Sequence, residues 1–84
     1  MDSEQAPVRF TGEEARAKLG SRVRSIVAID GIASGTSGRV MQVDEIESNR
    51  FDLIVEWDTR LEGKRQHDWF TKEQFERCLI GEPV

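Results

Sequence analysis

The chain has few residues that bind zinc or form disulfides: among 84 residues it has one cysteine and one histidine, and it also has only two prolines and no tyrosine. A single cysteine cannot form an internal disulfide, so we expect a reducing, cytoplasmic setting. The apolar runs are all short, which excludes a transmembrane helix and predicts that the protein has no membrane partner. No basic segment leads into an apolar stretch at the N-terminus, so no secretory signal is visible.

The same scarcity limits the chemistry that we expect. A zinc site would have to combine His67 with Cys78 and carboxylates, but no His/Cys ligand spacing is present. Cys78 shares an apolar helix face and is predicted to be buried rather than nucleophilic. Asp52, Glu56 and Asp58 are predicted to be solvated charges, because so small a domain offers no evident pocket for acid–base catalysis. The sequence therefore predicts no catalytic residue, no metal and no cofactor.

An excess of positive charge is also absent, since the net charge is −4. Residues 44–58 hold six acids against Arg50 alone. Basic residues flank this stretch: Arg22, Arg24 and Arg39 before it, and Arg60, Lys64 and Arg65 after it. An acidic domain repels phosphate backbones, which disfavours general nucleic-acid binding. We expect opposite charges to pair across strands; a local basic face of Arg22, Arg24, Arg60, Lys64 and Arg65 is the alternative.

Residues 1–9 are polar and show no period, which predicts a flexible tail ahead of a single domain at residues 10–84. Within this domain, two capping boxes are the clearest helix signals. Thr11-Gly-Glu-Glu14 begins a short helix through Leu19, which Gly20 ends. Thr71-Lys-Glu-Gln74 begins a second helix, with Phe70 stapled onto Phe75, and Gly81-Glu-Pro83 stops it.

The pattern between the helices is that of β-structure. Strands are predicted at residues 22–30, 39–46, 51–58 and 65–70, with a turn at 47–50 and a loop at 59–64. The clearest is 51–58, where apolar and polar residues alternate. Four strands joined by short turns, with a helix at each end, predict a mainly β domain that forms a barrel or roll.

A glycine-rich loop joins the first two predicted strands. Gly20-Ser-Arg-Val23, then Gly31 and Gly35, then Gly38-Arg-Val40 resemble the first hairpin of the KOW class of Src-homology-3-like barrels. The resemblance implies a small barrel of four to five strands whose relatives bind nucleic acid or proteins, or in a few cases are enzymes. The wider order of elements is similar to small bacterial proteins of unassigned role, so no activity follows from it.

The uncharged loop of residues 31–38 departs from nucleic-acid-binding members of this class, which tend to carry basic residues there. It also lacks the Gly-Lys-Ser/Thr ending of a phosphate-binding P-loop. We therefore expect its glycines to act geometrically, letting the hairpin curl so that Val23 and Val40 enter the core.

The hairpin of strands 51–58 and 65–70 has one register that pairs opposite charges, with Asp58 opposite Arg65. This register places Glu56 opposite His67, Ile54 opposite Trp69, Val55 opposite Asp68 and Leu53 opposite Phe70. The residues that then point inward are Phe51, Leu53, Val55, Trp57 and Phe70. Ile54, Arg65, His67 and Trp69 point outward and form the candidate binding surface.

The outward Trp69 has two interpretations. A terminal helix covers it, in which case Trp69→Ala costs about 3–5 kcal/mol of stability. Otherwise it is a binding hot spot, a role that Trp and Arg often take.

Three functional hypotheses follow. The first is a non-catalytic protein-interaction module, monomeric or weakly dimeric, that uses the Trp69 face or the hairpin loops. The second is a KOW-like nucleic-acid binder that uses the basic residues named above. The third is a small oligomeric enzyme similar to the type II dihydrofolate reductases. The active strand of those enzymes reads Val-Gln-Ile-Tyr, whereas the nearest stretch here is Gln66-His-Asp-Trp69.

Overall fold

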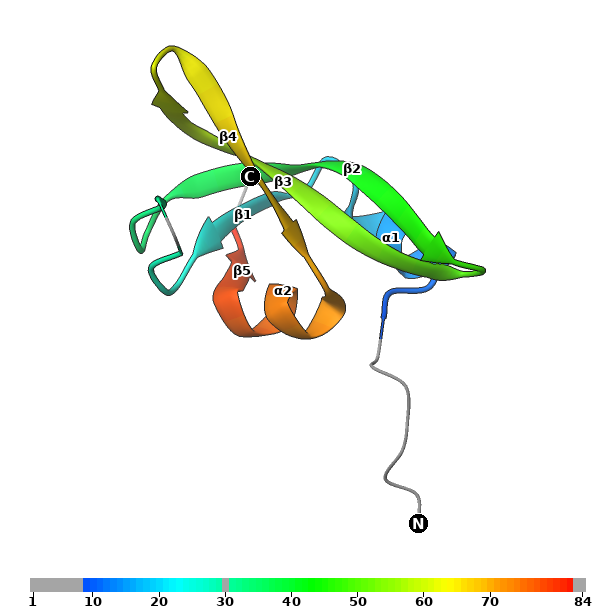
Figure 1. The fold of residues 1–84 in the computed structure, drawn as a ribbon. Helices are drawn as coiled ribbons and strands as arrows, with labels where there is room; N and C mark the ends of the chain where they lie inside the picture. The colour runs from blue at the N-terminus through cyan, green and yellow to red at the C-terminus, as the bar shows by residue number, and fades with distance from the viewer. Residues whose placement is uncertain (1–8, 30, 83–84) are drawn as a thin grey trace.

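The computed structural model describes residues 9–29 and 31–82 (Figure 1). The elements follow the order α1 (Gly12–Lys18), β1 (Arg22–Ser25), β2 (Ser37–Glu47), β3 (Arg50–Leu61), β4 (Lys64–Phe70), α2 (Lys72–Cys78) and β5 (Leu79–Gly81). The five strands form one antiparallel sheet in the order β4-β3-β2-β1-β5. The protein is therefore mainly β with two short helices, as predicted.

The sheet is open. Its edges are β4 and β5, and no pairing between the described residues joins them. The closed barrel that the sequence predicts is thus not confirmed. The hairpin of β3 and β4 projects away from the two helices (Figure 1). The predicted tail lies outside the described residues except for Arg9, whose guanidinium forms an ion pair with Asp52.

Both predicted capping boxes are confirmed. The Thr11 and Thr71 hydroxyls accept from the backbone N–H groups of Glu14 and Gln74, whose side chains accept from the threonine N–H groups in return. The ring of Phe75 lies edge-on to that of Phe70 at 6.4 Å, which confirms the predicted staple. These caps satisfy backbone donors that a helix of seven residues would otherwise leave open.

The first strand is shorter than predicted because Ser25 ends it. The buried Ser25 hydroxyl donates to the carbonyl of Ala33 and accepts from the N–H of Thr36, which closes a loop over residues 26–36. The N–H of Gly35 also donates to the Ser25 carbonyl. Residues 26–30, which the β-branched composition predicts as strand, therefore belong to this loop, apart from Asp30, which lies outside the described residues.

The strand β5 was predicted as the end of the second helix. The helix ends at Cys78, and Leu79–Gly81 instead pairs with β1, with Gly81 opposite Val23. This pairing gives β1 a neighbour on each side.

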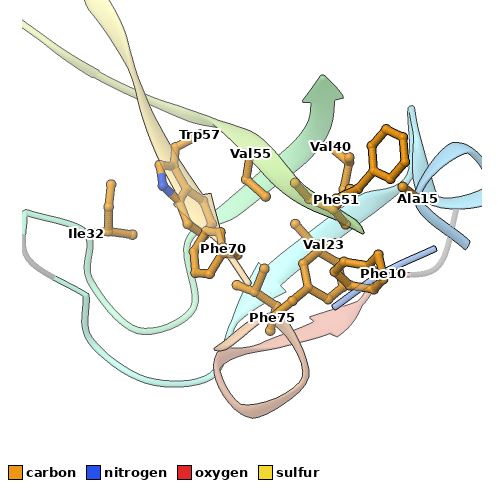
Figure 2. Close-up of a cluster of buried hydrophobic side chains, with 12 residues drawn as sticks. Phe10, Ala15, Val23, Ile32, Val40, Phe51, Val55, Trp57, Phe70 and Phe75 are labelled. Atoms are coloured by element: carbon orange, nitrogen blue, oxygen red, sulfur yellow. The ribbon is translucent and has the colours of Figure 1, made fainter. Parts of the chain in front are cut away.

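One face of the sheet, here called the inner face, packs against both helices. The predicted inward residues Phe51, Leu53, Val55, Trp57 and Phe70 are all buried on it, which confirms the alternation of β3 (Figure 2). Phe10, Ala15, Phe75 and Leu79 complete the core from the N-terminal segment, the helices and β5. The indole of the fully buried Trp57 donates to Asp68 Oδ2 at 2.7 Å, so its polar group is satisfied.

Gly38 lets β2 approach β3. It lies opposite both Val23 and Trp57, and a Cβ atom built on it would come within 2.8 Å of the Glu56 carbonyl oxygen and of the Trp57 ring. Val23 and Val40 are both buried, as predicted for the hairpin that these glycines shape. Glycine is needed at position 35 for another reason: its φ of +91° lies in the left-handed region, which glycine adopts without the steric cost that other residues have.

We expect Gly38→Ala to destabilise the fold by about 1–3 kcal/mol, because the new methyl group overpacks against backbone and indole. Gly81 is the matched control. It also lies opposite Val23, but a Cβ there meets nothing within 4 Å, so Gly81→Ala should stay within about 0.5 kcal/mol of the parent. Urea unfolding followed by circular dichroism measures both. Equal losses in the two variants would contradict this account of Gly38.

Candidate functional site

The face of the sheet opposite the core, here called the outer face, carries the predicted binding residues. Four of the five predicted β3–β4 pairings are confirmed: Glu56 with His67, Ile54 with Trp69, Val55 with Asp68 and Leu53 with Phe70. Because cross-strand partners share a face, two rows run across the outer face. One row holds Arg22, Arg39, Glu56 and His67; the next holds Gln42, Ile54 and Trp69.

The fifth predicted pairing, Asp58 with Arg65, is wrong. The register shifts between Glu56 and Arg60, and Arg65 lies opposite Arg60 instead. The cause is a bulge on β3, where residues 57–59 face only Gln66 on β4. The hairpin continues through the predicted loop to a turn at Glu62-Gly63, with φ values of 54° and 83°. Two left-handed residues in succession form the type I′ turn that suits a twisted hairpin.

Glu56 is the ionic centre of the outer face. Its Oε1 lies 3.3 Å from Nη1 of Arg65, and its Oε2 lies 3.3 Å from Nε2 of His67. The predicted Glu56–His67 cross-strand contact is thus confirmed. An open depression of about 450 Å³ adjoins Glu56, lined by Leu19, Gly20, Arg39, Val40 and Met41. Leu19, Arg39 and Met41 were not predicted as site residues; a β-bulge at Met41 and the end of α1 bring them there.

Asp58 forms a second ionic contact on the outer face. The Arg22 guanidinium bonds both of its oxygens, at 3.2 Å for the Nη1–Oδ1 pair. This hydrogen bond, with the charges of Arg22, Arg65 and Arg39, lowers the pKa of Asp58 below its ordinary value of 3.8. The pairing of opposite charges across strands, expected from the sequence, is therefore present.

The lowered pKa of Asp58 predicts a pH dependence. A carboxyl group whose pKa is lower in the folded state adds stability above its unfolded pKa and loses it as the pH falls through the folded pKa. The Asp58 side chain is half-exposed, so the effect on stability is small. In Arg22→Gln we expect the Asp58 carboxyl to titrate at a higher pH, measured by carbon-13 NMR. Arg24→Gln, altered two residues along β1, is the control and should leave that titration unchanged.

Trp69 is exposed and Ile54 is not. The Trp69 side chain is 60% exposed, whereas Ile54 opposite it is 5% exposed. Both helices pack on the inner face, so the hypothesis that a terminal helix covers Trp69 is wrong. Ile54 lies on the outer face as predicted but is a packing residue beneath this surface rather than an accessible contact.

Because Trp69 is exposed, its truncation should cost much less stability than the figure of about 3–5 kcal/mol expected for an indole covered by a helix. Trp69→Ala should cost less than about 1 kcal/mol, as exposed substitutions usually do. Trp57→Ala should cost about 3–5 kcal/mol, because it empties a fully buried site. Thermal unfolding of the two variants beside the parent measures the contrast. A loss at Trp69 as large as that at Trp57 would mean that the indole is packed.

The basic residues of the nucleic-acid alternative do not all gather at one place. Arg22 and Arg65 both lower the pKa of Asp58. Arg24 lies farther along β1, opposite Ser37 and Ile80. Arg60 and Lys64 lie next to the turn of the projecting hairpin, where Nη1 of Arg60 donates to the Gly63 carbonyl.

The other residues considered for chemistry in the sequence make ion pairs or packing contacts. Asp52, Glu56 and Asp58 each pair with an arginine. Cys78 is half-buried against the core. No three His, Cys, Asp or Glu side chains in residues 9–29 and 31–82 are placed to hold a metal ion. Neither described helix has the length or the apolar character to span a membrane.

Comparisons with protein-family models, with curated proteins and with solved structures give no significant match to this chain.

Proposed function

We propose that the protein is a non-catalytic binding module that holds a partner protein on the outer face around Trp69. The observation that carries the proposal is the 60% exposure of this indole on an ordered strand. Tryptophan is costly to leave in water, and exposed aromatic side chains beside arginine are characteristic of the centres of protein interfaces.

The surroundings of Trp69 suit such a contact. Arg65 and His67 lie on the same face of the same strand, and both are anchored by Glu56. The buried Ile54 supports the sheet opposite the indole. The side chains are thus held in place before a partner arrives, which lowers the entropy lost on binding. Met41, whose side chain is exposed, adds apolar surface at the depression beside Glu56.

We also propose that the domain belongs to the Src-homology-3-like class, of the KOW type. Support comes from the close approach at Gly38 and from the pairing of the last strand with the first. The binding of a partner on the outer face does not require a closed barrel, which is another feature of the class.

Nucleic-acid binding is the second candidate. The observation in its favour is that Arg22, Arg39 and Arg65 lie close enough to Asp58 to lower its pKa together. Against it, the Arg22 and Arg65 side chains are already engaged by Asp58, Glu82 and Glu56. The oligomeric-enzyme hypothesis stays a prediction from the sequence.

The binding proposal predicts that Trp69→Ala removes the partner. We expect about a 30-fold loss of affinity, the effect of a hot-spot truncation worth about 2 kcal/mol. Arg65→Gln should also weaken binding. The measurement is quantitative affinity purification from an extract of the native host, followed by titration of the recovered partner against each variant.

Ile46→Ala and Arg50→Gln are the matched controls. Ile46 is an exposed apolar residue and Arg50 an exposed arginine paired with Glu47, and both lie at the opposite hairpin, between β2 and β3. A partner that survives Trp69→Ala unchanged would refute the proposed surface. Short single-stranded DNA and RNA, titrated at low and high salt, test the second candidate, whose affinity must fall steeply with salt.

A further inference from the structure

The edge of β4 is the longer of the two open edges of the sheet. It spans Lys64–Phe70, whereas the opposite edge, β5, has three residues. Among the described residues, the backbone groups of this strand bond only those of β3. The other side of the strand therefore presents a row of donors and acceptors, which can bond a further strand.

The first half of β4 belongs to a ribbon of two strands that projects beyond the sheet. In the described part of the chain, β2 pairs with β3 only as far as Trp57, so residues 58–66 have no third strand beside them (Figure 1). A ribbon of two strands is at best marginally stable in water. Leu61, close to its turn, is exposed. A third strand along β4 would stabilise this ribbon.

Symmetry restricts how a second copy of the chain can meet this edge. Two antiparallel copies of one strand are related by a twofold axis perpendicular to the sheet, so outward residues of one copy pair with outward residues of the other. The outward residues of β4 are Arg65, His67 and Trp69, all of them exposed. The register that overlaps the whole strand places the axis at His67 and sets Arg65 opposite Trp69 of the second copy.

Arg65 and Trp69 are complementary in this register. Opposed residues have Cα atoms about 4.5–5.5 Å apart, so the guanidinium can lie over the indole in a cation–π contact. Arg65 holds Glu56 through Nη1, at the edge of its guanidinium, whereas stacking on an aromatic ring uses the planar face. The contact forms twice in the symmetric pair, and it covers the apolar surface of both Trp69 side chains.

The inward residues are complementary as well. Gln66 lies opposite Asp68 of the second copy, and its amide can donate to that carboxylate. Lys64 lies opposite Phe70 and diagonal to Asp68, the one acid of the strand, within the reach of a long side chain. No two lysines, arginines or acids face each other. His67 alone pairs with its own copy, and Glu56 lies beside it with a negative charge.

We propose that the partner on the outer face is a second copy of this chain, and that the two copies pair β4 with β4 in an antiparallel ladder centred on His67. The inference rests on the proposed function and names its partner. The two sheets become one continuous sheet, and Arg65 of each copy covers Trp69 of the other.

Self-association is tested first on the unaltered protein. Sedimentation and amide hydrogen exchange, measured from about 10 μM to about 1 mM, should show a dimer whose β4 amides exchange more slowly as its fraction rises. Trp69→Ala should raise the Kd of the dimer about tenfold, because two cation–π contacts are lost. Ile46→Ala, at the hairpin between β2 and β3, is the control and should leave the Kd unchanged.

Disulfide cross-linking tests the register, with Cys78→Ser as the background. His67→Cys should cross-link to itself under a mild oxidant, because opposed Cα atoms lie within the range that a disulfide spans. Arg65→Cys, exposed on the same face, is the matched control. Its two copies are about 13 Å apart along the ladder, so it should cross-link at least about tenfold more slowly. Mixed with Trp69→Cys, however, Arg65→Cys should cross-link readily.

Substitution of Gln66 tests the inward pairs. Gln66→Glu places like charges opposite each other twice and should raise the Kd of the dimer about fivefold, whereas Gln66→Lys should lower it by about the same factor. Thermal unfolding at low concentration, where the protein is monomeric, reports the effect of each change on the fold alone.

The outcomes separate the identity of the partner from the proposed function. A protein that stays monomeric at about 1 mM overturns the second copy as partner; the proposed function then stands if Trp69→Ala still loses a protein from the native extract. A dimer in which His67→Cys cross-links no faster than Arg65→Cys overturns the β4 ladder. If the ladder forms and Trp69→Ala leaves its Kd unchanged, strand pairing stands and the Trp69 surface is wrong.

Discussion

The contact between Gly38 and Trp57 is the constraint on which the rest of the structure depends. Trp57 is fully buried at the middle of the sheet, and it fits there because β2 offers no side chain opposite it. The same indole bonds Asp68, which ties β4 to the core. One close approach therefore positions three neighbouring strands, and it fixes which residues of β3 and β4 face outward.

That geometry divides the molecule into two surfaces of different chemistry. The inner face is apolar and is closed by Phe10, Ala15, Phe75 and Leu79. On the outer face Asp58 pairs with Arg22, Glu56 contacts Arg65 and His67, and neither helix covers this face. Trp69 is exposed on this face, because neither helix packs over its large apolar side chain. A small domain gains stability from burying aromatics, and the exposed Trp69 adds little of that stability.

Local signals in the sequence predicted the parts that depend on neighbouring residues. Both capping boxes and the alternation of β3 were predicted correctly, because each depends on residues only a few positions apart in the sequence. Charge pairing predicted the β3–β4 register correctly from Leu53 to Glu56. Beyond Glu56 the prediction failed, because no residue type in the sequence indicates the bulge there. The turn at Glu62-Gly63 was missed because glutamate rarely adopts the left-handed conformation that it has there. Trp69 was placed outward correctly, but whether a helix covers it depends on long-range packing.

The strand β5 has a consequence for how the chain folds. It was not predicted from the sequence, because its three residues gain their conformation from a partner more than fifty positions earlier. The strand β1 is therefore flanked on only one side until β5 has left the ribosome. The hairpins of β2, β3 and β4 are local and can form early, whereas the β1–β5 pairing must close a long loop. We expect the sheet to grow outward from β3, and its β5 edge to be the last part to become ordered and the first to open.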